Sequence, residues 1–265
     1  MPELPSELER EIFTIAFRSS GQDVALKLTL CLVARRVQFW IEHLFYEVVS
    51  ISGDRCANGF LSLVNSKPPG FFTVVNCLCI THSVKAVTAC SILAACTAVE
   101  SLACWVDSDG SSELPLLISR LPLHRLSIEL EHFAGIPLAS STWLSSLTHI
   151  DLIPWGPFPA QGLSTLRDFS RLTHVALYPD VMKGEMEHVV MVCSSCPCLQ
   201  VLVIPDTDGY IGLVLQPAHD PRMVEQKPAL DIIEDREAPY SGCEDMWSRA
   251  EIVLDQRKAL PVNNE

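Results

Sequence analysis

The segment Leu123-His124-Arg125-Leu126-Ser127-Ile128 returns 24 residues later as Leu147-Thr148-His149-Ile150-Asp151-Leu152, and then as Leu172-Thr173-His174-Val175-Ala176-Leu177. The shared pattern is aliphatic-x-x-aliphatic-x-apolar, and further copies begin at Val75, Val99 and Leu199. Successive copies are 24, 24, 24, 25 and 27 residues apart. Each copy ends in the alternation that is typical of a β-strand. The middle of the chain is therefore predicted to be a series of repeated strands.

A helical pattern precedes the strands. Its clearest copies have apolar residues at i, i+3, i+4 and i+7, the spacing of one helix face: Ala86, Ala89, Cys90 and Leu93, and later Met186, Val189, Val190 and Cys193. The unit is thus a helix followed by a strand. One such unit cannot offset the entropy of ordering it, so neighbouring units are expected to stack with their strands parallel.

A repeat of about 24 residues is short for the strand-helix-strand crossover of a doubly wound sheet, which takes roughly 30 residues or more. It lies within the roughly 20 to 29 residues of leucine-rich repeats, and the sequence resembles that family over residues 51–205. The resemblance implies an α/β solenoid of about six helix-strand units. The asparagine or cysteine that usually follows each strand in that family is replaced here by other residues: Ser83, Asp107, Glu131, Trp155, Asp180 and Thr207.

Residues 1–50 are predicted to form a separate head of three short helices. The first helix begins beside Pro5 and carries Leu8, Ile12 and Ile15 on one face, and two further apolar segments follow. This head resembles the F-box, and fungal F-box-like proteins in particular. The resemblance is carried by Leu4-Pro5-Ser6-Glu7-Leu8, Ile12-Phe13, Val33-Ala34-Arg35-Arg36 and Trp40.

The F-box resemblance implies docking to the adaptor subunit of a cullin-based ubiquitin ligase. The positions that match the motif are Leu4, Pro5, Leu8, Ile12, Val33 and Trp40. The solenoid would then present a target protein for ubiquitin transfer. The alternative is a stand-alone repeat scaffold with no ubiquitin role, in which the head only caps the open edge of the first repeat.

The repeat register predicts where a target would bind. The third residues of successive units are expected to stack on one sheet face, which makes Arg125, His149 and His174 neighbours. The full candidate target-binding set is Trp105, Arg125, Glu129, His149, Asp151, His174 and Tyr178. The histidines would make binding depend on pH near neutrality. The alternative interpretation of these residues is a solvated face without a partner.

Residues 206–265 are predicted to contain acidic, proline-rich loops and a C-terminal capping helix. Loops are expected over 205–240, because five prolines accompany the acidic run from Asp231 to Glu237. From Glu244 onward, the spacing predicts a helix that ends before Pro261 and shields the last strand. Its expected buried side consists of Met246, Trp247, Ala250 and Leu254.

Charge and composition restrict the partners and the compartment. The formal net charge is −13, a sign that repels phosphate backbones, so no nucleic-acid partner is expected. No apolar stretch reaches the roughly 18 to 20 residues of a membrane helix, and the N-terminus does not resemble a secretory signal. We therefore expect a cytoplasmic or nuclear protein with no membrane contact. Its 11 cysteines are expected to be reduced and mostly packing residues.

The sequence favours a protein-interaction module over an enzyme. It has no phosphate-binding loop, no nucleophile elbow and no zinc-protease helix. We therefore predict no catalytic residues, no cofactor and no metal, with a hydrolase carrying a family-specific site as the alternative. Cys193-Ser194-Ser195-Cys196 contains a Cys-x-x-Cys pair, but a structural zinc site needs four ligands and a second pair is lacking. Cys196 matches Cys96 in repeat position, which favours packing over zinc or redox chemistry.

Overall fold

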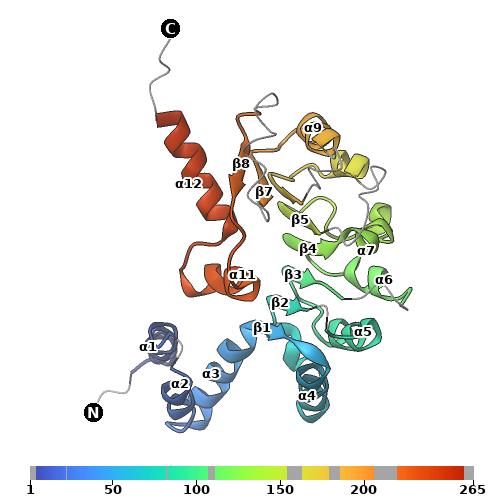
Figure 1. Ribbon diagram of the computed structural model, residues 1–265. Coiled ribbons are helices and arrows are strands. Elements are labelled where there is room, and N and C mark those ends of the chain that lie inside the picture. The colour runs from blue at the N-terminus through green and yellow to red at the C-terminus, as the bar shows by residue number, and fades with distance from the viewer. Residues whose placement is uncertain are drawn as a thin grey trace.

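Eight parallel strands form one open sheet, and their order in space is their order along the chain (Figure 1). The computed structural model describes residues 4–21, 23–81, 83–106, 111–153, 163–178, 186–205 and 220–259. The strands are β1 (Val48–Ile51), β2 (Cys77–Ile80), β3 (Ser101–Cys104), β4 (Arg125–Glu129), β5 (His149–Ile153), β6 (His174–Leu177), β7 (Val201–Pro205) and β8 (Met223–Gln226). The fold is α/β and solenoid-like, as the repeat predicts.

The repeat register is confirmed for the six predicted strands. Leu126 of β4 pairs with Leu102 on one side and with Ile150 on the other, and the same alignment continues to the outer strands. Equivalent residues of the repeat are therefore neighbours across the sheet. The 24-residue step works because each copy returns the chain to the same point of the next strand.

Two strands lie outside the predicted six, so two expectations were wrong. The sequence predicts an all-helical head over residues 1–50, but Val48 begins β1, because the β-branched Val48 and Val49 favour a strand once the helix has ended. Loops are predicted to dominate 205–240, of which 206–219 lie outside the described residues. In the described part, residues 223–226 form β8 and residues 232–241 form a helix. Prolines flank β8 at 221 and 228, which is compatible with a short edge strand.

One face of the sheet, called here the outer face, packs against the helices that connect the strands (Figure 1). Its central row is Leu78, Leu102, Leu126, Ile150, Val175 and Leu202. The connecting segments are α4 (Gly53–Ser66), η1 (Phe71–Val74), α5 (Ala86–Ala95), α6 (Leu114–Ile118), α7 (Leu130–Ala134), η2 (Leu138–Ser140), η3 (Ser164–Asp168) and α9 (Met186–Ser195). The helices predicted at 86–93 and 186–193 are confirmed.

In the middle repeats, large aromatic side chains fill the space that full helices occupy elsewhere. Trp143 is fully buried, stacks on Phe169 at 5.8 Å between ring centroids, and donates its indole N–H to the Ile118 carbonyl at 2.8 Å. The Phe133 ring also lies near Phe169, with 6.4 Å between ring centroids. The core therefore continues past short connections such as η2 and η3.

The N-terminal head consists of α1 (Ser6–Ser19), α2 (Val24–Cys31) and α3 (Arg35–Glu47), and α3 leads directly into β1. Its small core is built on Phe17, Val37 and Ile41. A two-point ion pair joins Arg36 to Glu9, with both N···O distances at 2.8 Å. The three predicted helices are thus present, but most of the apolar side of α1 does not take part in this core.

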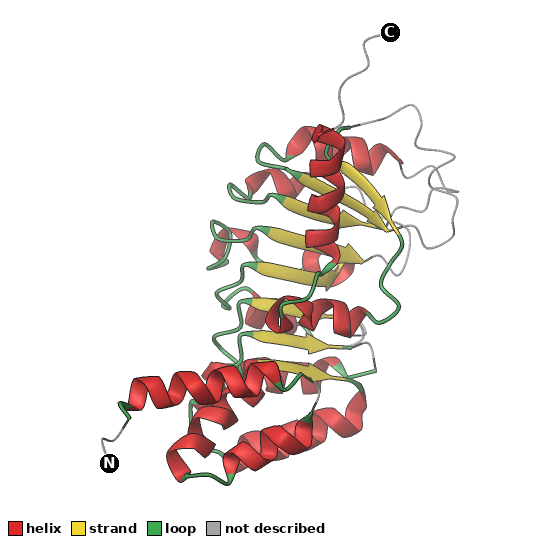
Figure 2. Ribbon diagram, turned by 90° about the vertical axis from the view of Figure 1, so that its left-hand side faces the viewer, coloured by secondary structure: helices red, strands yellow, loops and turns green. Residues whose placement is uncertain are grey.

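The opposite face of the sheet is called here the inner face. The third residue of each repeat unit lies on it, and these residues form a row across the strands. This row is Cys77, Ser101, Arg125, His149, His174 and Val201. Two C-terminal helices, α11 (Ile232–Ser241) and α12 (Met246–Ala259), lie across it (Figure 2). Among the helices in the described ranges, none is both long and apolar enough to span a membrane.

Candidate interaction surfaces

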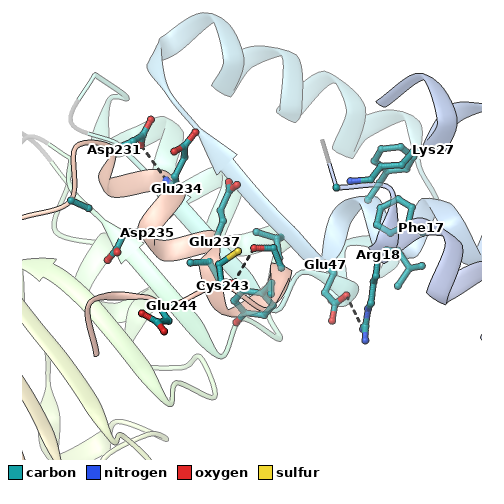
Figure 3. Close-up of a pocket in the computed structure, with 18 of the residues that line it drawn as sticks. Phe17, Arg18, Lys27, Glu47, Asp231, Glu234, Asp235, Glu237, Cys243 and Glu244 are labelled. Atoms are coloured by element: carbon teal, nitrogen blue, oxygen red, sulfur yellow. Dashed lines mark hydrogen bonds and ion pairs between the residues drawn. The ribbon is translucent and has the colours of Figure 1, made fainter. Parts of the chain in front are cut away.

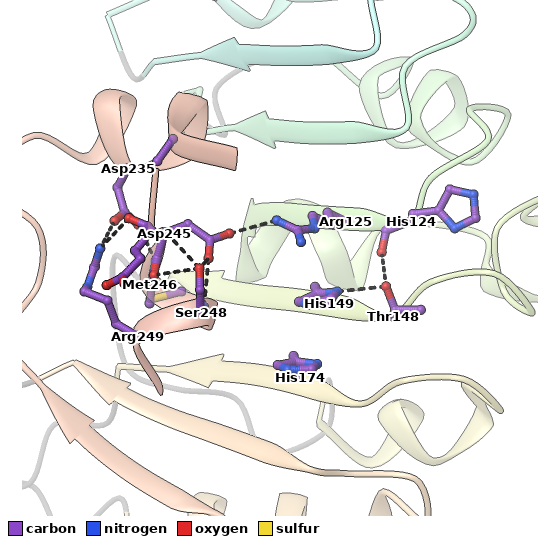
Figure 4. Close-up of polar contacts among 12 residues, drawn as sticks. His124, Arg125, Thr148, His149, His174, Asp235, Asp245, Met246, Ser248 and Arg249 are labelled. Carbon is purple, nitrogen blue, oxygen red and sulfur yellow. Dashed lines mark hydrogen bonds and ion pairs between the residues drawn. The ribbon is translucent and has the colours of Figure 1, made fainter. Parts of the chain in front are cut away.

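The inner face brings together the polar residues that the repeat register singles out. Arg125, His149 and His174 are adjacent in register, and the two imidazole rings stack with centroids 4.1 Å apart and planes 14° from parallel. Each ring is hydrogen-bonded to the threonine before it. Thr148 Oγ1 lies 2.8 Å from His149 Nδ1 (Figure 4), and Thr173 Oγ1 lies 2.8 Å from His174 Nδ1. Two successive Thr-His pairs therefore fix both rings.

Both histidines are neutral near pH 7. Burial, together with the nearby His174 and Arg125, lowers the pKa of His149 to about 2. Burial also lowers the pKa of His174, against the opposing effect of the Glu251 carboxylate. The expectation that these histidines titrate near neutrality is therefore wrong for the folded chain, because the sheet and the helices above it remove water from the rings.

A buried polar chain lies beside the histidines. Trp105 donates its indole N–H to Ser127 Oγ at 2.9 Å, and Ser127 donates to Asp151 Oδ2 at 2.7 Å. Arg236 of α11 donates to the same Asp151 oxygen, and its guanidinium lies 5.9 Å from the centroid of the Trp105 ring. Asp151 is fully buried, and burial raises its pKa while Arg236 opposes that shift. Asp151 and Arg236 thus form a buried ion pair between the sheet and α11.

The contacts of α12 with the inner face are also polar and aromatic. Arg125 donates to Asp245 at 2.8 Å just before α12 begins (Figure 4). The Trp247 ring meets His149 and His174 edge-on, at 5.3 and 5.6 Å between centroids. Glu251 lies 3.1 Å from His174 Nε2. These side chains contact Arg125 and both histidines of the predicted set.

The candidate target-binding residues are therefore neighbours, but they do not form an open surface. Trp105, Glu129, Asp151 and His174 are buried, and Tyr178 is half-buried with its pKa raised by burial and by the charge of Asp151. The solvated-face alternative is wrong for the same reason. Their role in target binding stays a prediction.

The sequence found one side of this contact and missed the other. The predicted shielding helix is confirmed, with Met246, Trp247, Ala250 and Leu254 buried. Arg236, Asp245 and Glu251 were not singled out, because a single charged residue in a loop or on a helix carries no signal of its partner. Only the repeat register, which places Asp151 and Arg125 on a common face, indicates where such charges would be needed.

The Cys-x-x-Cys segment packs at the end of α9. Cys196 is buried in the main core, like Cys96 at the matching repeat position, whereas Cys198 is exposed. Burial raises the pKa of Cys196 to about 11. Within the described ranges, no group of three or more histidine, cysteine or acidic side chains is arranged to hold a metal ion. Packing explains Cys196 without further chemistry.

The head presents a second surface, of opposite character. Leu4, Leu8, Ile12 and Val33, four of the six candidate adaptor-binding residues, are 51%, 54%, 53% and 59% exposed. Pro5 is exposed as well, whereas Trp40 is only partly exposed and packs against the head core. The neighbouring apolar side chains that are also exposed are Ile15, Val24, Leu26, Leu28 and Leu32.

A cavity of about 660 Å³ lies between the head and α11 (Figure 3). Phe17, Leu44 and Phe45 contribute apolar walls, and two cations, Arg18 and Lys27, line the head side. The acidic lining residues are Glu47, Asp231, Glu234, Asp235, Glu237 and Glu244. An excess of carboxylates repels anionic ligands, so this cavity is poorly suited to phosphate compounds.

The comparisons with known proteins give one partial similarity. No protein-family model matches the chain. A segment of 93 residues is 30% identical to part of the lysosomal acid phosphatase of the rat, Rattus norvegicus. The match covers 35% of this chain and spans 22% of the length of that phosphatase.

Proposed function

We propose that the chain is a non-enzymatic, F-box-like substrate receptor, which docks to the adaptor subunit of a cullin-based ubiquitin ligase through α1 and α2. The observation that carries the proposal is the exposed apolar side of this head in the free chain. Ten of the seventeen large hydrophobic residues exposed in the described ranges lie between residues 4 and 39. Such a concentration of exposed apolar side chains is typical of a protein-binding surface.

The same observation favours docking over simple capping of the solenoid. A cap would bury its apolar side against the first repeat. In this head, α3 contacts the edge strand β1, whereas the apolar side chains of α1 and α2 stay exposed. Leu8 and Ile12 contribute little to the packing of the head, since more than half of each side chain is exposed. In this proposal the sheet behind the head is a leucine-rich-repeat-like support for a target protein.

Coexpression with the ligase adaptor subunit, followed by pull-down, tests the docking surface. Leu8→Asp and Ile12→Asp should each abolish capture of the adaptor, because a carboxylate in an apolar interface must be desolvated. Val87→Asp, at a residue of α5 that is 66% exposed, is the matched control and should bind normally. Capture of the adaptor by Leu8→Asp at the level of the unmodified chain would overturn the proposal.

Thermal unfolding of the same variants separates docking from capping. Docking predicts that Leu8→Asp leaves the melting temperature almost unchanged, because exposed substitutions typically change stability by no more than about 0.5 kcal/mol. Capping predicts a clear decrease, since the apolar side would then be needed to close the sheet edge.

A second candidate function, hydrolysis of phosphate monoesters, is favoured by the partial similarity to the rat phosphatase. The acidic lining of the cavity beside α11 argues against it. Assay of the purified chain with p-nitrophenyl phosphate between pH 4 and 8 decides between the two. We expect no turnover above buffer, and turnover that copurifies with the chain through two chromatography steps would support the phosphatase.

A further inference from the structure

Residues 231–259, called here the C-terminal cover, meet the inner face in the way that a bound protein segment would. We propose that the inner face is a recognition site for a helical protein segment carrying an arginine, and that the C-terminal cover occupies this site in cis. This inference rests on the proposed target-binding role of the repeat sheet. It names the chemistry of the target and a competitor within the same chain.

The arginine site is built around Asp151. This carboxylate is fully buried, lies at the base of the site, and is held by Ser127, which Trp105 holds in turn. The guanidinium of Arg236 enters above it and lies against the Trp105 ring. A buried carboxylate beside an aromatic ring suits arginine better than lysine. A planar guanidinium can donate two hydrogen bonds to a carboxylate and can also stack on an aromatic ring.

The cover leaves the carboxylate incompletely satisfied. Arg236 donates to Oδ2, the oxygen that Ser127 already uses, whereas Oδ1 makes no hydrogen bond to any described residue. A buried acceptor without a donor is unfavourable. An arginine that reached both oxygens from a different helix would bind this site better than Arg236 does, which gives a target the means to displace the cover.

The neighbouring contacts define the rest of the ligand. Arg125 and His174 each meet a carboxylate, from Asp245 and Glu251 respectively. Trp247 lies between them, edge-on to the stacked histidines. The site therefore fits a segment that presents an arginine, an acid about nine residues farther along, an aromatic side chain about eleven residues along and a second acid about fifteen residues along, as Arg236, Asp245, Trp247 and Glu251 do.

The attachment of the cover is suited to displacement. A short connection, residues 227–230, joins it to β8, and Lys227, Pro228 and Leu230 in this connection are exposed. Glu251, whose side chain is 54% exposed, makes its contact from the solvent edge. Movement of the cover would break the hydrogen bonds that join it to β8, from Gln226 to the Met246 carbonyl and from Arg257 to the Met223 carbonyl, but it would leave the pairing of β8 with β7 in place.

A titration in trans tests the site. The receptor is the full chain carrying Arg236→Gln, whose own cover lacks the arginine, and the probe is a fluorescein-labelled peptide of residues 229–259. Fluorescence anisotropy should show saturable binding of this peptide. The same peptide with Arg236→Gln should bind at least about tenfold more weakly, because it lacks the charged hydrogen bond to Asp151. A peptide with Glu234→Gln, at an exposed position of α11, should bind like the unmodified one.

Two outcomes would overturn the proposal. Absence of binding to the folded receptor would show that the inner face accepts no segment in trans. Equal binding of the unmodified and Arg236→Gln peptides would show apolar packing without arginine recognition. If Arg236→Gln prevents folding of the receptor, Trp247→Ala replaces it with the same expected order of affinities. The titration contains no adaptor subunit, so its failure leaves the proposed docking of the head unaffected.

Discussion

The head and the inner face differ in which kind of side chain they expose and which they bury. The head exposes apolar residues such as Leu8 and Ile12, whereas the inner face buries polar residues such as Asp151 and His174. Exposed apolar side chains point to a partner outside the chain. Buried polar ones require a partner already in place, and here the C-terminal cover supplies it through Arg236 and Glu251. Surface character alone therefore does not reveal which face is available.

The largest expected effect comes from breaking the buried ion pair on the inner face. Asp151→Ala should lower the free energy of unfolding by about 3 to 5 kcal/mol, because it leaves Arg236 buried without its carboxylate. Urea unfolding followed by tryptophan fluorescence measures the change. The double variant Asp151→Ala with Arg236→Met should recover part of the loss. A double variant no more stable than Asp151→Ala would show that the charge of Arg236 is not the cause.

The repeat core should respond almost as strongly. Leu126 is 1% exposed in the outer-face row, so Leu126→Ala should lower the free energy of unfolding by about 2 to 5 kcal/mol through the cavity that it creates. Chemical denaturation at constant pH provides the value. A loss below about 1 kcal/mol would contradict the placement of this residue in a closely packed ladder.

Acid should destabilise the inner face more moderately. The pKa of His149 is lowered in the folded chain, so the unfolded chain binds the extra proton as pH falls below about 6.5. The neutral His149 of the folded chain therefore contributes stability at pH 7 that is lost as the pH falls. At pH 5 this residue should lower the free energy of unfolding by about 1 to 2 kcal/mol. Comparison of the unmodified chain with His149→Gln at both pH values isolates the effect. The same pH dependence in both chains would contradict the assignment.

The head should give the smallest change. Leu8 is 54% exposed, so Leu8→Ala should alter the free energy of unfolding by no more than about 0.5 kcal/mol. The measurement is the one used for Leu126→Ala, and the two leucines serve as a matched pair. A loss at Leu8 comparable to that at Leu126 would mean that the head packs against something within the chain.

The sequence was most informative where residues recur. The 24-residue repeat predicted six of the eight strands, their parallel order and the adjacency of Arg125, His149 and His174. It did not predict β8, which carries only four residues between prolines. Nor did it predict that Arg236 would meet Asp151, because 85 residues separate them and no periodic pattern links them. Long-range pairing of single charges depends on where a whole helix packs, which local sequence does not specify.

Hydrogen exchange of the intact chain, resolved by mass spectrometry, tests most directly whether residues 231–259 close the inner face. We expect the slowest exchange in β4 to β6, faster exchange in α12, and still faster but measurably protected exchange in α11. Protection in α12 equal to that of the strands would contradict a displaceable cover. Unprotected α11 and α12 beside protected strands would contradict the closure itself.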